Sequence, residues 1–487
     1  MKKKEKVKRN VELDEENKRR RRMNREMAMV TYIFMFLFVF MAGYVIWFLA
    51  GDTDQILNNT QNRRQELLAE RVEKGRILSA GGKVLAKTTV DKEGNEKRSY
   101  PYNGLFAHVV GRTVQGKTGL EATESYTMLT TGINPLTGLL NELKGDKNPG
   151  NDVVTTLNVK LSQIASDALG SRKGAVVVME PGTGKILAMV SKPTYNPNQV
   201  KANWESLVQD SQENSALYNR ATQGLYPPGS TFKLYTLLEF VRENPEYKQF
   251  QYTCKGKVGD GADTIHCYGH EIHGKIGLKR GFAKSCNAAF AQIGAGLNVS
   301  KWSETCHSLY YNSQLGIKEL EQKEPVFEVS AGTANGDVMQ MAIGQGSVLT
   351  TPLQNAYLVA AAVNGGTLMK PYVVDRVQDT YGGVVKEFGP NAAATPLTEE
   401  EAKVLKQYMR ETVLTGTATA LNTSNYKAGG KTGSAQFKEG STDSHAWFVG
   451  YAEKGKRKVV VSIIVEGGGT GSAQAVPIAR SIFDEYF

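Results

Sequence analysis

A run of 24 residues without a charged side chain, from Met27 to Ala50, divides this chain into a short and a long segment. The run is rich in Phe, Met, Val and Ile, and as a helix it is long enough to cross roughly 30 Å of hydrocarbon. We therefore expect residues 27–50 to form a transmembrane helix. A cleaved signal peptide is the alternative, but its apolar region is only about 7–15 residues long and ends in a small-x-small site. Here Phe48-Leu49-Ala50 lacks the first small residue.

The 26 residues before this run are strongly basic. They contain 12 Lys or Arg against 6 Asp or Glu, including four consecutive arginines at 19–22, and carry +6 of the chain's net charge of +10. Positive charge beside a membrane helix favours the cytoplasmic side. We therefore expect residues 1–26 to be a cytoplasmic tail and the chain from Gly51 onward to lie outside the cytoplasm. Because the basic charge is concentrated beside the membrane helix, it does not indicate a nucleic-acid-binding protein.

The long segment after residue 50 is predicted to contain two domains. Residues 51–155 are polar, with short strand-like runs between turn sequences such as Asn148-Pro149-Gly150, which is typical of a small accessory domain. Residues 156–487 contain two apolar hairpin patterns, at 175–190 and 446–465, and a helix pattern after the capping box of Thr398 and Glu401. Hairpins of an antiparallel sheet with helices packed on it indicate an α+β fold.

Three short motifs follow one another in the second of these domains. They are Ser230-Thr231-Phe232-Lys233, Ser285-Cys286-Asn287 and Lys431-Thr432-Gly433. Each alone is short enough to occur by chance in a chain of 487 residues. In this order they form the signature of an enzyme that acylates its own serine.

Ser230 is predicted to be the nucleophile. It follows Pro227-Pro228-Gly229 and precedes an apolar helix predicted for residues 232–241, so free backbone N–H groups at the helix start favour an oxyanion. Lys233 lies one turn later on the same helix face. Burial, and a second cation at Lys431, would lower the pKa of Lys233 from ~10.4 toward the range in which a neutral amine accepts the serine proton.

The other two motifs are predicted to complete the site. Ser285 would relay a proton to the leaving amine, and Asn287 would hold an amide of the substrate. Lys431 and Thr432 can hold a substrate carboxylate, and Gly433 allows close approach of the substrate backbone. The N–H of Ser434 can complete an oxyanion hole with that of Ser230.

Together these motifs resemble those of the class B penicillin-binding proteins. Further similarity to that family extends over nearly the whole chain: Gly75-Arg76-Ile77-Leu78, Arg98-Ser99-Tyr100-Pro101, Gly119-Leu120-Glu121, Asn219-Arg220-Ala221 and Gly344-Gln345-Gly346. The resemblance implies a membrane-anchored D,D-transpeptidase that forms a serine acyl-enzyme with peptidoglycan stem peptides ending in D-Ala-D-Ala, releases D-Ala and is inhibited covalently by β-lactams. It implies no cofactor for the chemistry. A D,D-carboxypeptidase, a β-lactamase and a non-catalytic penicillin sensor remain as alternatives.

The resemblance also implies a place and a partner. The place is the bacterial cell membrane, with one membrane pass and the catalytic domain outside. The partner is a polytopic glycosyltransferase of the shape, elongation, division and sporulation family. The accessory region of 105 residues is too short for a glycosyltransferase domain of its own, which argues against a bifunctional class A protein.

Between the first two motifs lies a segment with the spacing of a metal site. Cys254, Cys267, His270 and His273 supply the two thiols and two imidazoles of a closed tetrahedral zinc site, with His266 as a spare ligand. The segment is rich in glycine and poor in apolar residues, so a zinc ion there would be structural. A Cys254–Cys267 disulfide and four unconnected loop residues are the two competing interpretations. Cys286 and Cys306 are expected to be small buried thiols.

Overall fold

The computed structural model describes residues 2–51, 64–92, 95–209, 216–437 and 443–487. It contains two compact units, residues 1–62 and 63–487, and each is described by itself. In the first unit, helix α1 (Lys2–Gly51) includes both the basic tail and the apolar run. Its large apolar side chains are exposed all round, as in Phe36 at 69 % and Trp47 at 65 %. Among the described residues, α1 is the one helix long and apolar enough to cross a membrane.

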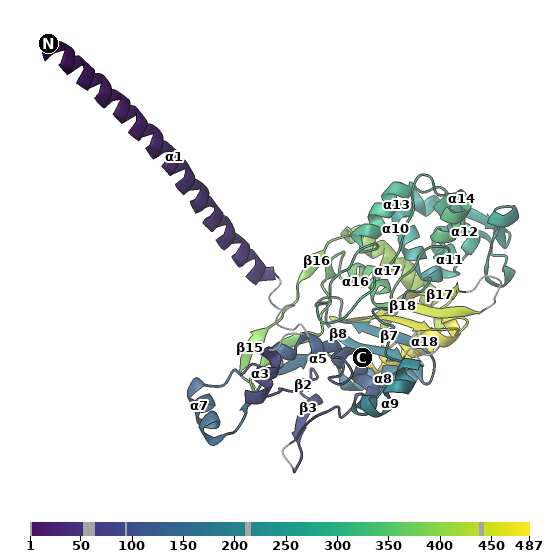
Figure 1. Ribbon diagram of the computed structural model, residues 1–487. Helices are drawn as coiled ribbons and strands as arrows, with labels where there is room; N and C mark the ends of the chain where they lie inside the picture. Colours follow the sequence, from purple (N-terminus) through teal and green to yellow (C-terminus); the bar gives the residue numbers. More distant parts are fainter. Residues whose placement is uncertain (1, 52–63, 93–94, 210–215, 438–442) are drawn as a thin grey trace. The chain divides into compact units, whose positions relative to one another are not determined.

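The part of the second unit that contains Lys431 is built on a five-stranded antiparallel sheet in the order β17-β18-β19-β7-β8 (Figure 1). Its strands are β17 (Lys427–Gln436), β18 (Ser444–Lys454), β19 (Arg457–Val465), β7 (Gly174–Met179) and β8 (Ile186–Lys192). Both hairpins predicted from the sequence are present, as β7–β8 and β18–β19. Among the described strands, β17 pairs only with β18, so its other edge is free of strand pairing there.

Helices cover both faces of this sheet, which confirms the α+β fold. On one face, α8 (Val159–Leu169) and α18 (Gly471–Tyr486) bury one set of alternating strand residues, such as Val176 and Val178. On the other face, α10 (Lys233–Glu243), α16 (Tyr357–Val363) and α17 (Glu399–Leu414) bury the alternate set, such as Val177 and Met179. Helix α17 begins at the predicted capping box, in which the Thr398 and Glu401 side chains each bind the other's backbone N–H.

A second sheet joins the predicted accessory region to a distant part of the chain. Its strand order is β15-β14-β6-β2-β3-β4, with β15 (Val384–Glu387), β14 (Val374–Gln378), β6 (Asp152–Thr155), β2 (Ile77–Leu78), β3 (Val84–Val90) and β4 (Glu96–Ser99). Beside this sheet, the fully buried Glu121 accepts from Arg98 at 2.7 Å and Lys74 at 2.8 Å. Since β14 and β15 lie far beyond Thr155 in the sequence, this sheet crosses the predicted domain boundary at 155/156, which remains a prediction.

A group of short helices and a small ribbon lies beyond the free edge of β17. The helices are α11 (Leu278–Ala283), α12 (Asn287–Ala295), α13 (Val299–Ser308) and α14 (Asn335–Ala342). The ribbon consists of two antiparallel strand pairs, β9 (Gln251–Cys254) with β12 (Gly274–Gly277) and β10 (Lys257–Val258) with β11 (Ile265–His266). Stacked and edge-on aromatic rings around Phe232 hold α10 against α13.

Candidate active site

Ser230 lies in a tight turn just before helix α10. The turn is a single 3-10 turn, Gly229–Thr231, so the α-helix begins at Lys233, three residues after the serine. Gly229 has φ of +54°, and its N–H donates to the carbonyl oxygen of Gly344 at 2.8 Å. A Cβ on Gly344 would lie 2.1 Å from the Gly229 oxygen, and one on Gly229 would lie 3.0 Å from the Ser434 oxygen. Both positions therefore require glycine for the turn to fit between residues 344–346 and strand β17.

Lys233 is fully buried directly beneath the serine hydroxyl. Its Nζ donates to Ser230 Oγ at 3.1 Å, to the Ser285 backbone oxygen at 2.9 Å and to Asn287 Oδ1 at 2.7 Å. Burial lowers the pKa of Lys233 from its ordinary value to about 8. Near neutral pH a useful fraction of this amine is therefore uncharged and able to accept the Ser230 proton.

Ser285 connects the first and third motifs. Its Oγ accepts from Lys431 Nζ at 2.8 Å and lies 3.4 Å from Lys233 Nζ. Its φ of +59° is in the left-handed region, which is uncommon for a residue with a side chain and recurs at functional sites. The next residue, Cys286, is the N-cap of α12, and its Sγ accepts the Ala289 N–H at 3.4 Å. The start of α12 therefore holds the left-handed serine in place.

Asn287, the first residue of α12, is held from two sides. Its Oδ1 accepts from Lys233, and its Nδ2 donates to the backbone oxygen of His266 at 2.9 Å. An amide nitrogen carries two N–H groups, so the second can still meet a substrate. The contact with His266 ties the second motif to the ribbon segment.

The third motif lies on the free edge of the sheet, in β17. Lys431 is fully buried, and burial together with the charge of Lys233 lowers its pKa well below the ordinary value. Thr432 Oγ1 lies 2.5 Å from Thr417 Oγ1, so two hydroxyls stand together at this edge. A Cβ on Gly433 would lie 2.9 Å from the Pro228 oxygen. This glycine therefore allows β17 to approach the Ser230 turn, a reason that the sequence did not indicate.

The structure thus brings all three motifs to one place. Ser230 Oγ, Lys233 Nζ, Ser285 Oγ and Lys431 Nζ form one continuous series of contacts. Two buried ammonium groups that share one hydroxyl repel each other, so the pair favours a state in which one amine is neutral. Ser434 is half-buried beside Gly229, at the place expected for a backbone donor near the nucleophile.

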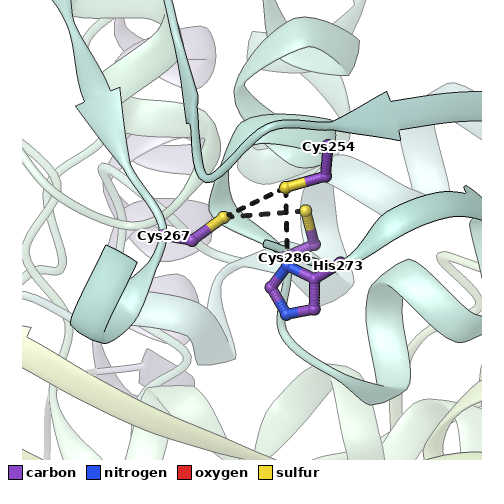
Figure 2. A group of neighbouring side chains, drawn as sticks. All are labelled: Cys254, Cys267, His273 and Cys286. Atoms are coloured by element: carbon purple, nitrogen blue, oxygen red, sulfur yellow. Dashed lines mark hydrogen bonds between the residues drawn. The ribbon is translucent and has the colours of Figure 1, made fainter. Parts of the chain in front are cut away.

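The predicted metal-site residues are gathered only in part. Cys254, Cys267, His273 and Cys286 lie together, with their Sγ and ring nitrogen atoms all within 4.8 Å of one another (Figure 2). His270 is not in this group: it is exposed, in a left-handed conformation with φ of +57°, and its ring packs on His266. Its place is taken by Cys286, which the sequence analysis treated only as a buried thiol. All four cysteines of the chain are unpaired.

Comparison with known proteins gives a consistent result. Residues 174–484 match the family described as the penicillin binding protein transpeptidase domain. The chain is 31 % identical over 463 residues to peptidoglycan D,D-transpeptidase PbpA of Mycolicibacterium smegmatis, covering 86 % of this chain and 90 % of that protein. It is 27 % identical to peptidoglycan D,D-transpeptidase MrdA of Acinetobacter baumannii, covering 80 % and 65 %.

Solved structures resemble most of this chain. The structure of penicillin-binding protein A from Mycobacterium tuberculosis as a ceftriaxone acyl-enzyme complex matches with a TM-score of 0.78 and 28 % identity, covering 86 % of this chain and 98 % of that chain. The imipenem acyl-enzyme of the same protein matches with a TM-score of 0.76 and 28 % identity, covering 86 % and 99 %.

Proposed function

Because this chain belongs to the class B penicillin-binding proteins of the transpeptidase family, we propose that its acyl-enzyme forms on Ser230. The chain is a peptidoglycan D,D-transpeptidase, a serine enzyme that cross-links stem peptides with release of D-Ala and is inhibited covalently by β-lactams. The observation that carries the assignment to Ser230 is its 3.1 Å contact with the buried amine of Lys233.

In the first half-reaction, neutral Lys233 accepts the Ser230 proton as Oγ attacks the carbonyl carbon of the penultimate D-Ala. The N–H groups of Ser230 and Ser434 stabilise the oxyanion. The C–N bond to the terminal D-Ala then breaks, and Lys233 returns the proton through Ser285 Oγ to the leaving amine. Ser285 suits this relay because its hydroxyl lies between both lysines.

In the second half-reaction, the amine of a neighbouring stem peptide attacks the ester carbonyl and loses its proton along the same path. The new amide forms and Ser230 regains its hydroxyl. Asn287 offers its second N–H to the substrate peptide, and Thr432 and Thr417 hold the terminal carboxylate with their hydroxyls until the terminal D-Ala leaves in the first half-reaction. Lys431 donates to Ser285 and to the Thr432 oxygen, so it supports this carboxylate site mainly through its charge. No step needs a cofactor.

The acceptor distinguishes a transpeptidase from a hydrolase. We expect the full-length chain in detergent, given a stem-peptide thioester and a D-amino acid, to form more amide product than free acid. Free acid alone would indicate a D,D-carboxypeptidase, and repeated turnover of penicillin would indicate a β-lactamase. A penicillin adduct with neither product would indicate a non-catalytic penicillin sensor, and absence of both adduct and product would refute the proposed function. The Ser230→Ala variant is the matched control for the background reaction.

The remaining parts of the chain are proposed to serve this activity. Residues 1–26 lie in the cytoplasm, 27–50 of α1 span the membrane, 51–155 form a pedestal and 156–487 the transpeptidase domain. The partner that supplies glycan strands is a polytopic glycosyltransferase of the shape, elongation, division and sporulation family, as the anchor, the accessory domain and the family resemblance imply. A structural zinc ion beside the site, predicted from the cysteine and histidine spacing, is part of the proposal.

The proposed orientation predicts a protease result. Protease added to intact protoplasts should digest the chain after residue 50 and leave an N-terminal tag on the tail intact, because the basic tail favours the cytoplasmic side. In permeabilised cells the tag should also be lost, which serves as the control. Protection of the large unit in intact protoplasts would refute both the orientation and a role in the cell wall.

A further inference from the structure

The four clustered side chains have the spacing of ligands around one ion (Figure 2). Zinc binds thiolate sulfur at about 2.3 Å and imidazole nitrogen at about 2.0–2.1 Å, so a tetrahedral site has sulfur–sulfur edges of about 3.8 Å and sulfur–nitrogen edges of about 3.6 Å. Here Cys254 Sγ lies 3.6 Å from Cys267 Sγ and 3.5 Å from His273 Nδ1, and Cys267 Sγ lies 3.8 Å from Cys286 Sγ. Three thiols and one imidazole are a ligand set that selects zinc.

The surroundings of these ligands also fit a metal site. The three cysteines are each at most 2 % exposed, and backbone N–H groups of Gly256 and Ala289 donate to Cys254 Sγ and Cys286 Sγ at 3.4 Å. Such donors stabilise thiolate charge. With Nδ1 of His273 directed at Cys254, its buried Nε2 has no hydrogen-bond partner among the described residues and lies 3.6 Å from Glu271 Oε2. A carboxylate beside the outer nitrogen is the usual support of a metal-bound histidine.

The ribbon that carries three of these ligands contributes few apolar residues to the main core, namely the buried Ile265 and the partly buried Val258. Its strands are only two to four residues long. The buried apolar cluster at this place consists of the three cysteines together with only Ile276, Ala288 and Ala289. So small a core contributes little burial energy, and segments of this kind are commonly stabilised by a metal or a disulfide.

A disulfide explains these contacts less well than a metal. A Cys254–Cys267 bond would require the sulfurs to approach from 3.6 Å to about 2.0 Å. It would also leave the Cys286 thiol and the His273 ring gathered around it without a function. An ion uses all four groups, whose ligand atoms already lie within 4.8 Å of one another.

We propose that Cys254, Cys267, His273 and Cys286 bind one zinc ion, and that this ion positions the Ser285-Cys286-Asn287 motif for acylation. Four protein ligands close the coordination sphere, so the ion orients neighbouring groups and does not itself activate water or substrate. The ligand Cys286 comes from the catalytic motif itself, which links the ion directly to the residues on either side of it.

The ion acts on the motif from two sides. Through Cys286 it fixes the backbone between Ser285, which receives Lys431 Nζ at 2.8 Å, and Asn287, which receives Lys233 Nζ at 2.7 Å. Through Cys267 it fixes the neighbouring His266, whose backbone oxygen accepts from Asn287 Nδ2 at 2.9 Å. Release of the ion would free both attachments, and a misplacement of about 1 Å in such a site can cost about 10²-fold in rate. This inference rests on the proposed acylation of Ser230.

The test uses the full-length chain in detergent, produced with zinc present and purified without a chelator. Elemental analysis should give about one zinc per chain. Cys254→Ser, Cys267→Ser and His273→Gln should each lose it. Two variants serve as matched controls and should keep it: Cys306→Ser, which changes a buried cysteine outside the cluster, and His270→Gln, which changes the exposed histidine. Cobalt in place of zinc should give the visible spectrum of a tetrahedral thiolate site, altered in Cys286→Ser.

The link to catalysis is measured on the same preparations with a fluorescent penicillin. Chelation, or Cys254→Ser, should slow acylation about 10- to 100-fold, and added zinc should restore the rate of the chelated wild type but not of the variant. A metal-free wild type with an oxidised Cys254–Cys267 pair would overturn the site. If the purified chain holds one zinc ion and its removal by chelation leaves the acylation rate unchanged, the positioning role would be overturned. Zinc-loaded wild type that penicillin does not label would instead refute the proposed function and leave the metal site standing.

Discussion

Ser230→Ala is expected to abolish covalent labelling by fluorescent penicillin while the chain remains folded. The substitution removes one half-buried hydroxyl from a turn that backbone contacts hold, namely the Gly229 N–H to the Gly344 oxygen. Lys233 keeps its contacts with the Ser285 oxygen and Asn287 Oδ1, so its ammonium is still satisfied. The melting temperature should therefore change little, whereas the adduct, detected on a gel and by intact mass, should be absent.

A serine outside the site provides the control for this result. Ser481→Ala, on the exposed side of α18, should be labelled like the wild type. A penicillin adduct of normal mass on the Ser230→Ala chain would show that another nucleophile forms the acyl-enzyme. In that case the whole assignment of roles around Lys233 and Ser285 would be wrong.

The local placement of Ser230, Lys233 and Lys431, which are proposed to act in catalysis, could be predicted because it depends on local sequence. The Pro-Pro-Gly stop before Ser230 and the one-turn spacing to Lys233 determine one local arrangement. The glycines of β17 and the apolar hairpin after them likewise indicate the sheet edge that carries Lys431. Each of these patterns lies within a few residues, where backbone geometry limits the outcome.

The contacts that the sequence did not predict join distant segments. Cys286 replaces His270 near the other cysteines because the start of α12 packs against the ribbon, whereas His270 lies in an exposed left-handed turn. The spacing of residues along the chain reveals neither the packing of α12 on the ribbon nor the exposed turn at His270. Likewise β14 pairs with β6 across more than two hundred residues, and the need for glycine at 344 comes from the Gly229 oxygen. The sequence held one sign of this contact: Gly344 is a glycine that no predicted turn explains.

After loss of the nucleophile, loss of either buried lysine is expected to have the largest effect on the rate of acylation. Lys233→Ala and Lys431→Ala should each slow acylation by at least ~10²-fold, the usual scale for loss of a general base or of a fixed charge. The measurement is the second-order rate of penicillin labelling, with Lys301→Ala on the exposed side of α13 as the control.

Arginine variants and the pH dependence separate the roles of the two lysines. Arginine keeps the charge but is not deprotonated in proteins, so Lys233→Arg should remain inactive while Lys431→Arg recovers part of the rate. Because neutral Lys233 is the active form and its pKa is about 8, wild-type acylation should rise with pH up to about 8 and then level off. A rate that is independent of pH across that range, or a fully active Lys233→Arg chain with an unchanged melting temperature, would mean that Lys233 holds the site by charge alone and that another group accepts the Ser230 proton.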